Sequence, residues 1–151
     1  MINDVRIKKV ETYPDDRGYF REVIKEGEEV FAEVKQTSVT VTYSAVIKAF
    51  HWHRHQEDIW YVASGMARIV LYDQREDSST YKETQVIVAG EDNSLVVRIP
   101  IGVVHGYQVL GQKPVMLFYH TTKAYDPSHP DEERIAWNDP TIGFDWSVKN
   151  R

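Results

Sequence analysis

Alternation of apolar and polar residues dominates the chain and predicts β-strands. From Val39 to Ala49 the odd positions are apolar or small, and the even positions are mostly Thr, Ser and Lys. A period of two over this length is typical of one long, half-buried strand. Six further β-rich runs follow, separated by turn-forming residues: Ile59–Ala63, Met66–Tyr72, Gln85–Ala89, Leu95–Ile99, Gly106–Leu110 and Val115–Thr121.

Many short strands without helical patterns between them predict an all-β fold, either an antiparallel sandwich or a barrel. Few short helices are expected: Glu26–Val34 is the one fair helix candidate, and Asp131–Trp137 favours a turn. The 151 residues suit a single domain with one core, and no linker or repeat divides residues 1–151.

Composition excludes several kinds of chemistry. The chain has no Cys, which removes disulfides, thiolate nucleophiles and Cys-ligated zinc. Its net charge of −5 argues against nucleic-acid or membrane-surface binding, because no basic excess is present to neutralise phosphates. Residues 1–10 do not resemble an export signal, and no apolar run is long enough to cross a membrane. We therefore expect a soluble cytoplasmic protein whose chemistry comes from His, carboxylates, Tyr, Lys or a metal.

Three of the six histidines cluster at His51, His53 and His55, and alternation along extended backbone would place them on one face. A Pro-x-Gly turn later delivers His105 to the start of another strand. Imidazoles with a carboxylate suit Mn, Fe or Zn, as in metal-binding cupins. One hypothesis is therefore a metal site made of His51, His53, Glu57 and His105. The alternative is that His53 and His55 lie on a solvated loop.

Motifs along the whole chain resemble those of the dTDP-4-dehydrorhamnose 3,5-epimerase family, small cupin-fold enzymes that epimerise 4-keto nucleotide sugars. The order of the motifs carries the resemblance, since each alone is weak. They are Asp16-Arg17-Gly18-Tyr19-Phe20-Arg21-Glu22; Gln36-Thr37-Ser38; Lys48-Ala49-Phe50-His51; residues 73–80, from Asp73 to Thr80; Ile99-Pro100-Ile101-Gly102 followed by Val103-Val104-His105-Gly106-Tyr107; and the closing Phe118-Tyr119, Tyr125-Asp126-Pro127 and residues 135–140.

The resemblance implies a cupin jelly-roll sandwich (a double-stranded β-helix) and an isomerase that needs no cofactor. Such an enzyme removes a proton acidified by the 4-keto group, passes through an enolate and reprotonates C3 or C5 from the other face. By the same resemblance, His51 is the catalytic base, Tyr119 is the opposing acid and His105 lies close to the base.

Binding residues follow from the same comparison. The resemblance implies that Arg17 and Glu22 contact the nucleotide of a dTDP-linked sugar, and that Gln36 and Arg75 contact the nucleotide or its diphosphate. Lys48 stands where the family usually has an Arg near the diphosphate or the sugar. Lys keeps the charge of that Arg but loses its bidentate geometry.

Two further departures from the family pattern bear on activity. Asp58 stands about where the family carries a Lys that helps to stabilise the enolate, and the chain ends soon after Trp146, before a segment that supplies an Asp to orient the base. Glu57 or Asp58 could provide that orienting carboxylate instead. Epimerisation at one carbon only, keto-isomerisation and a different nucleotide sugar all remain compatible. So do a metal-dependent cupin (an isomerase or a dioxygenase) and a sugar-binding cupin without catalysis.

The resemblance also implies a homodimer in which an N-terminal strand crosses to the partner's sheet. Val5–Tyr13, with apolar residues at Val5, Ile7 and Val10, is the segment expected to do so.

Overall fold

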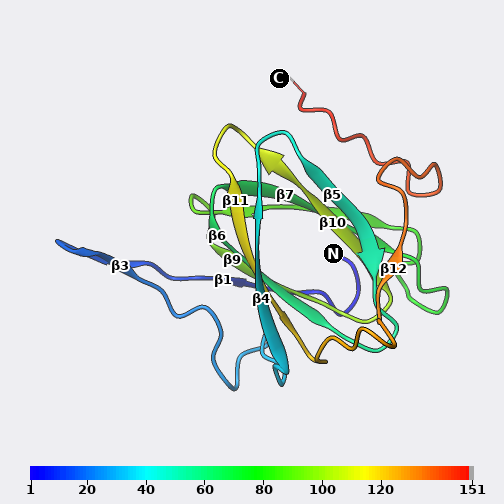
Figure 1. Cartoon of the computed structure of the whole chain (residues 1–151), viewed down its shortest axis with the longest axis horizontal. Helices are drawn as coiled ribbons and strands as arrows, with labels where there is room; N and C mark the ends of the chain where they lie inside the picture. The colour runs from blue at the N-terminus through cyan, green and yellow to red at the C-terminus, as the bar shows by residue number, and fades with distance from the viewer. Residues whose placement is uncertain (150–151) are drawn as a thin grey trace.

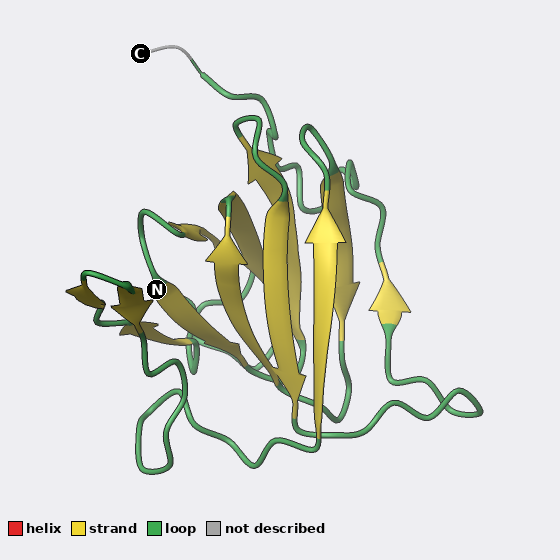
Figure 2. Ribbon diagram, turned by 60° about the vertical axis from the view of Figure 1, so that its left-hand side comes forward, coloured by secondary structure: helices red, strands yellow, loops and turns green. Residues whose placement is uncertain are grey.

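The computed structural model describes residues 1–149, which form strands, turns and loops but no helix (Figure 2). None of the described residues belongs to a helix that could cross a membrane. The strands are β1 (Arg6–Lys9), β2 (Tyr13–Asp15), β3 (Gly18–Phe20), β4 (Gln36–Thr42), β5 (Ile47–Trp52), β6 (Asp58–Ser64), β7 (Met66–Asp73), β8 (Thr84–Gly90), β9 (Leu95–Ile99), β10 (Val103–Leu110), β11 (Val115–Thr121) and β12 (Glu133–Arg134).

Two antiparallel five-stranded sheets make up the body of the molecule. The first has the order β1-β9-β6-β11-β4 and the second the order β12-β5-β10-β7-β8. The small β2–β3 hairpin extends away from this body (Figure 1). The expected all-β, cupin-like sandwich is confirmed, and the six shorter strands fall close to their expected positions. The segment Val5–Tyr13, expected to cross to a partner's sheet, does not leave its own chain here: its strand β1 pairs with β9 of the first sheet.

The main core lies between the two sheets. Alternate residues of the central strands point into it, including Trp60, Leu71, Val97 and Leu117, all at most 3% exposed. Burial of these side chains is the main favourable contribution to the stability of the sandwich. Their neighbours in sequence point outward, as the pleat of a strand requires.

Loops cover both outer faces, and one of them replaces the expected helix at Glu26–Val34. Val23, Ile24 and Val30 pack on the outward side chains of β6 without forming a helix. Gly27 has a φ of 91°, a conformation incompatible with an α-helix. The helix prediction is therefore wrong, and the apolar residues that suggested it cover the outer face of the first sheet. On the second sheet, Phe144 and Trp146 cover Phe50 and Tyr72.

The single strand expected from Val39 to Ala49 is also wrong, because it is two strands in different sheets. A turn at residues 43–46 separates β4 from β5, and Ala45 adopts a φ of 65° there. Val39, Val41 and Tyr43 are 55%, 49% and 73% exposed. The alternation was real for β4, but its apolar set faces outward from an edge strand.

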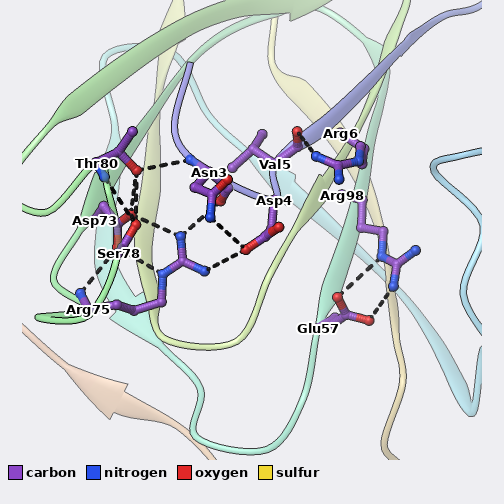
Figure 3. A network of polar contacts seen from close by, with 10 residues as sticks. All are labelled: Asn3, Asp4, Val5, Arg6, Glu57, Asp73, Arg75, Ser78, Thr80 and Arg98. Carbon is purple, nitrogen blue, oxygen red and sulfur yellow. Dashed lines mark hydrogen bonds and ion pairs between the residues drawn. The ribbon is translucent and has the colours of Figure 1, made fainter.

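A buried carboxylate ties the N-terminus to the loop between β7 and β8 (Figure 3). Asp73 is fully buried and accepts hydrogen bonds from Arg75 (2.8 Å to Nε), Ser78 (2.6 Å) and Thr80 (2.7 Å). Arg75 also donates to the carbonyl oxygen of Asn3 at 2.8 Å. Burial alone would raise the pKa of Asp73, but the Arg75 guanidinium and the two hydroxyls outweigh it and hold the pKa far below 3.8.

We expect Asp73→Asn to lower the free energy of unfolding by about 3 kcal/mol, because it leaves the Arg75 charge without its buried partner. Since the pKa of Asp73 is depressed on folding, its contribution is complete above pH 3.8 and is lost as the pH falls further. Urea unfolding at several pH values measures both effects. Asp77→Asn, an exposed neighbour, is the matched control. A neutral effect of Asp73→Asn at pH 7 would contradict this account.

Candidate active site

His51 and His105 come from neighbouring strands of the second sheet. They are register partners in the β5–β10 pair, with ring centroids 4.1 Å apart, and a bulge between His105 and Tyr107 interrupts the pairing. Gly106 permits this approach, since a Cβ there would lie 2.4 Å from the Cβ of Ala49. A Cβ contact that short would force strands β5 and β10 apart.

We expect Gly106→Ala to destabilise the protein by about 1–3 kcal/mol through overpacking. It should also displace His105 relative to His51. Thermal unfolding and the histidine signals in NMR spectra measure these two effects. Gly111→Ala is not an equivalent control, because Gly111 has a positive φ of 72°. Ala67→Gly, at a buried position of the neighbouring strand β7, serves as a comparison in which side-chain volume is removed instead of added. A Gly106→Ala protein as stable as the wild type would contradict the close approach.

His53 and Asp58 complete a buried cluster with these two histidines. His53 follows the end of β5, and Asp58 is the first residue of β6. Oδ1 of Asp58 lies 3.5 Å from Nε2 of His53, and Oδ2 lies 3.6 Å from Nε2 of His105. One nitrogen or oxygen from each of His51, His53, Asp58 and His105 lies within 4.8 Å of those of the others. Four titratable groups therefore converge on one point.

Neighbouring groups fix the orientation of three members of this cluster. Nδ1 of His105 donates to the carbonyl oxygen of Val103 at 2.8 Å, and Nδ1 of His53 donates to that of Asp131. The Asp58 carboxylate accepts hydrogen bonds from Trp60 Nε1 at 3.0 Å and from Gln56 Nε2 at 2.8 Å.

The pKa values separate the roles of these groups. Burial, together with repulsion from His105 and His53, lowers the pKa of His51 to about 2, so its imidazole is neutral and its lone pair is free of a proton. Burial would also lower the pKa of His53, but the Asp58 carboxylate outweighs it and raises that pKa. Burial would raise the pKa of Asp58, but His105 and His53 hold it well below its usual range. Asp58 is therefore a buried carboxylate, and His51 is a neutral base.

Two adjoining hollows, of about 460 and 670 Å³, open onto His51, Asp58 and Tyr119. Their size suits a small ligand. Lys48 lines the first hollow, where its ammonium donates to the hydroxyl of Thr40 at 2.8 Å. Gln36 lines the second, and its side-chain oxygen accepts from the backbone N–H of Tyr125. The expected site residues His51, Tyr119, Lys48, Gln36 and Asp58 thus line the two hollows, and His105 lies beside His51 in the cluster.

Glu57 does not join them. Its carboxylate pairs with Arg98 at 2.7 Å, as Figure 3 shows, because adjacent strand residues point to opposite sides. The expectations that Glu57 orients the base or binds a metal are therefore wrong, and Asp58 is the carboxylate inside the cluster. His55 is also outside the buried cluster: its side chain is exposed at the lining of the second hollow, and its backbone N–H donates to Asp131.

Three expected substrate contacts lie outside both hollows in this chain. Arg17, 84% exposed, pairs with Asp15 on the projecting hairpin, and Glu22 is exposed just after it. Arg75 is held by Asp73 in the network described above.

Sequence reasoning missed several lining residues. Trp60 and Tyr107 line the first hollow from β6 and β10, where alternation alone made them ordinary core residues. Arg134 and Glu132 line it from in and around β12, a stretch expected only to turn. In the antiparallel pair of β12 and β5, Arg134 lies directly opposite His51. No motif marked Glu132 or Arg134, because strand pairing alone brings β12 to the site.

Comparison with known proteins matches this chain to a family. The family model for dTDP-4-dehydrorhamnose 3,5-epimerase matches residues 1–151. The chain is 48% identical to the spore coat polysaccharide biosynthesis protein SpsL of Bacillus subtilis over 151 residues, all of both chains. It is 36% identical to the probable low-salt glycan biosynthesis epimerase Agl13 of Haloferax volcanii, covering 98% of this chain and 96% of that one.

A solved structure agrees with these sequence matches. The dTDP-6-deoxy-D-glucose-3,5-epimerase of Legionella pneumophila, solved with dTDP-4-keto-L-rhamnose, superposes with a TM-score of 0.86. The two sequences are 25% identical over all of this chain and 82% of that one.

Proposed function

The chain belongs to the dTDP-4-dehydrorhamnose 3,5-epimerase family, and from that premise we propose that it epimerises C3, C5 or both in a 4-keto-6-deoxy hexose carried on dTDP. The observation that carries the proposal is the neutral His51 at the wall of a hollow that Tyr119 also lines. A base and a hydroxyl acid in one hollow are the groups that proton removal and return require.

His51 takes the proton from the carbon beside the keto group, and the electron pair moves onto the keto oxygen as an enolate. The O–H of Tyr119 then gives a proton to the opposite face of that carbon, and the enolate returns to the ketone. One proton leaves and one enters, so the reaction consumes no redox cofactor. Solvent restores the protonation of His51 and Tyr119 after each turnover.

The charged side chains of the hollows support a diphosphate substrate. Lys48 and Arg134 line the first hollow, and Lys123 lines the second. Acidic residues line the hollows as well, and Arg134 pairs with Glu132 at 2.7 Å. Lys48 is therefore the cation that we assign to the diphosphate. Lys48 keeps a charge where the family uses Arg, so it binds phosphate as a point charge rather than bidentately.

We further propose a homodimer, in which the projecting hairpin carries Arg17 and Glu22 to the second copy's hollow. The hairpin leaves the body of its own chain (Figure 1), and its exposed Tyr19 and Phe20 are apolar surface that a second copy would cover. Light scattering after size exclusion tests the dimer. Arg17→Ala should then weaken dTDP binding in the dimer.

The experiment for the reaction is incubation with a dTDP-4-keto-6-deoxy hexose in deuterated water, followed by NMR. Deuterium at C3, C5 or both, together with inversion, is the expected result, and the labelled carbons give the number of centres epimerised. A folded protein that binds dTDP but gives no exchange at either carbon contradicts the proposal.

A further inference from the structure

We propose that Gln56 is a positioning residue for the base: its amide joins His53 and Asp58 into one hydrogen-bonded unit that keeps the Asp58 charge beside His51. Nε2 of Gln56 lies 2.8 Å from Oδ1 of Asp58 and 3.3 Å from Nε2 of His53. An amide nitrogen carries two N–H donors, so one side chain serves both partners. The inference rests on the proposed epimerase reaction, because it concerns the group that removes the proton.

The direction of each hydrogen bond in this unit follows from its far end. The carbonyl oxygen of Asp131 only accepts, so a neutral His53 ring has its proton on Nδ1 and its lone pair on Nε2. That lone pair accepts one N–H of Gln56, and the Asp58 carboxylate accepts the other. The reverse orientation of the amide would place its oxygen against a carboxylate oxygen and a ring lone pair. Gln56 is therefore the donor to both groups.

Asp58 depends on its two donors because it is buried. It is 2% exposed, and an unpaired charge at such a position is costly. Gln56 donates to Oδ1, while Trp60 Nε1 donates to Oδ2 at 3.0 Å. Nε2 of His105 lies 3.6 Å from Oδ2, which is too long for a good hydrogen bond. Removing the Gln56 amide would leave Oδ1 without its donor.

His51 packs against the groups that this unit holds. Its ring centroid lies 4.1 Å from that of His105 and 5.2 Å from that of His53, both in edge-on contacts. A ring nitrogen of His51 and an oxygen of Asp58 lie within 4.8 Å of each other. Burial, His105 and His53 lower the pKa of His51, whereas the Asp58 anion acts in the opposite direction. The position of the Asp58 charge thus determines how well His51 holds the proton that it removes.

Gln56 also prevents His53 from neutralising that charge. Nε2 of His53 lies 3.5 Å from Oδ1 of Asp58, the same oxygen to which Gln56 donates. Burial opposes a charge on His53, but Asp58 outweighs burial and raises the pKa of His53. A protonated His53 would pair with Asp58 and repel a proton on His51. The Gln56 N–H opposes this protonation, because a hydrogen bond to the neutral form of a group disfavours its charged form. The titratable groups that face His53 are His51 on β5, Asp58 on β6, His105 on β10 and Asp131 before β12.

Asp131 anchors the unit to the loop that lines the second hollow. Besides its carbonyl contact to His53, its carboxylate accepts from the backbone N–H groups of Arg54 and His55 at 2.8 and 2.9 Å. Residues 53–56 are thus fixed by Asp131 at one end and by the Gln56–Asp58 hydrogen bond at the other. A segment fixed at both ends holds its side chains in one geometry, as a positioning role requires.

The test replaces Gln56 with Met, which keeps the length and much of the volume of the side chain but has no N–H donor. We expect kcat for deuterium exchange to fall by about 10–100-fold, while KM and the affinity for dTDP change by less than about 2-fold. Gln56→Glu, which accepts but does not donate, should lose at least as much activity. Gln112→Met, at an exposed glutamine in the loop between β10 and β11, is the matched control and should behave as the wild type. Normal exchange by Gln56→Met overturns the proposal. Loss of dTDP affinity with an unchanged kcat also overturns it, because Gln56 lines the second hollow and would then be a substrate contact.

A double variant tests whether Gln56 acts through Asp58. Asp58→Asn removes the charge that Gln56 holds, so adding Gln56→Met to it should lower kcat by less than about 2-fold further. Two independent contributions would multiply instead, and that result overturns the assignment.

The hydrogen-bonded unit is also measurable without activity, in protein with nitrogen-15 in its histidine rings. Wild-type His53 should show the NMR signals of a neutral ring that is protonated on Nδ1 and hydrogen-bonded at Nε2. In Gln56→Met the Nε2 signal should shift, and His53 should become charged at a higher pH than in the wild type, because the donor that favours the neutral ring is lost. Unchanged His53 signals overturn the proposal.

The two proposals fail separately. If wild-type protein gives no deuterium exchange while its His53 signals depend on Gln56, the epimerase proposal fails and the hydrogen-bonded unit stands. If wild-type and Gln56→Met proteins exchange at the same rate, the positioning proposal fails and the epimerase proposal stands.

Discussion

Replacing His51 with Asn is expected to reduce deuterium exchange at the sugar carbon by about 10³-fold or more, in line with the loss of a general base. Asn can fill much of the space of the imidazole but cannot accept the proton. The measurement is the rate of deuterium incorporation by NMR, with dTDP affinity determined by calorimetry on the same sample.

The affinity separates an enzyme from a protein that only binds the sugar. His51 lines the hollow, but the proposed phosphate contacts come from other residues, so dTDP binding should change only a few-fold. His55→Asn is the matched control for the reaction, because it removes an exposed histidine of the same segment that lines the second hollow but lies outside the buried cluster. Exchange that survives in His51→Asn at the wild-type rate would show that another group is the base.

Tyr119→Phe is expected to lower the rate of inversion at the sugar carbon by about 10²–10⁴-fold, while the rate of deuterium exchange at that carbon stays largely unchanged. The ring keeps its place in β11, between β4 and β6, but the proton donor for the second face is lost. His51 still removes the proton, exchanges it with solvent and returns deuterium to the face it came from. The product should therefore be the labelled, uninverted starting sugar.

Stereochemical analysis of the recovered sugar, together with its deuterium content, tests this outcome. Tyr125→Phe is the matched control, since Tyr125 lines the second hollow but is 62% exposed. Loss of exchange and inversion together in Tyr119→Phe would instead assign Tyr119 to the first proton transfer. Normal inversion would remove it from the mechanism.

The positions of His51 and Tyr119 in different sheets also explain why their variants should affect exchange and inversion separately. His51 comes from β5 in the second sheet, and Tyr119 comes from β11 in the first. Each is held by its own sheet, so replacing one side chain leaves the backbone that carries the other unchanged. The sandwich thus supplies two rigid walls for chemistry on two faces of one carbon.

Local patterns were sufficient for much of the fold. Six strands from Ile59 to Thr121 were predicted near their observed bounds, because alternation reports a strand that has one buried face. The pattern failed at Val39–Ala49, since the exposed apolar face of β4 has the same period as a buried one. It failed again at Glu26–Val34, where apolar spacing fitted a helix but Gly27 and the outer face of β6 dictated an irregular loop.

The sequence by itself predicted the family, because short motifs occur along it in a fixed order, and the family model confirms it. The same motifs pointed to His51, Tyr119 and His105, of which the first two line one hollow and the third lies beside His51. The sequence also placed two acidic residues side by side at Glu57 and Asp58. Only the tertiary structure decided between them: the register of β6 turns Asp58 inward to His53 and His105 and turns Glu57 outward to Arg98. Adjacent residues of a strand face opposite sides, and which side is buried depends on partners distant in sequence.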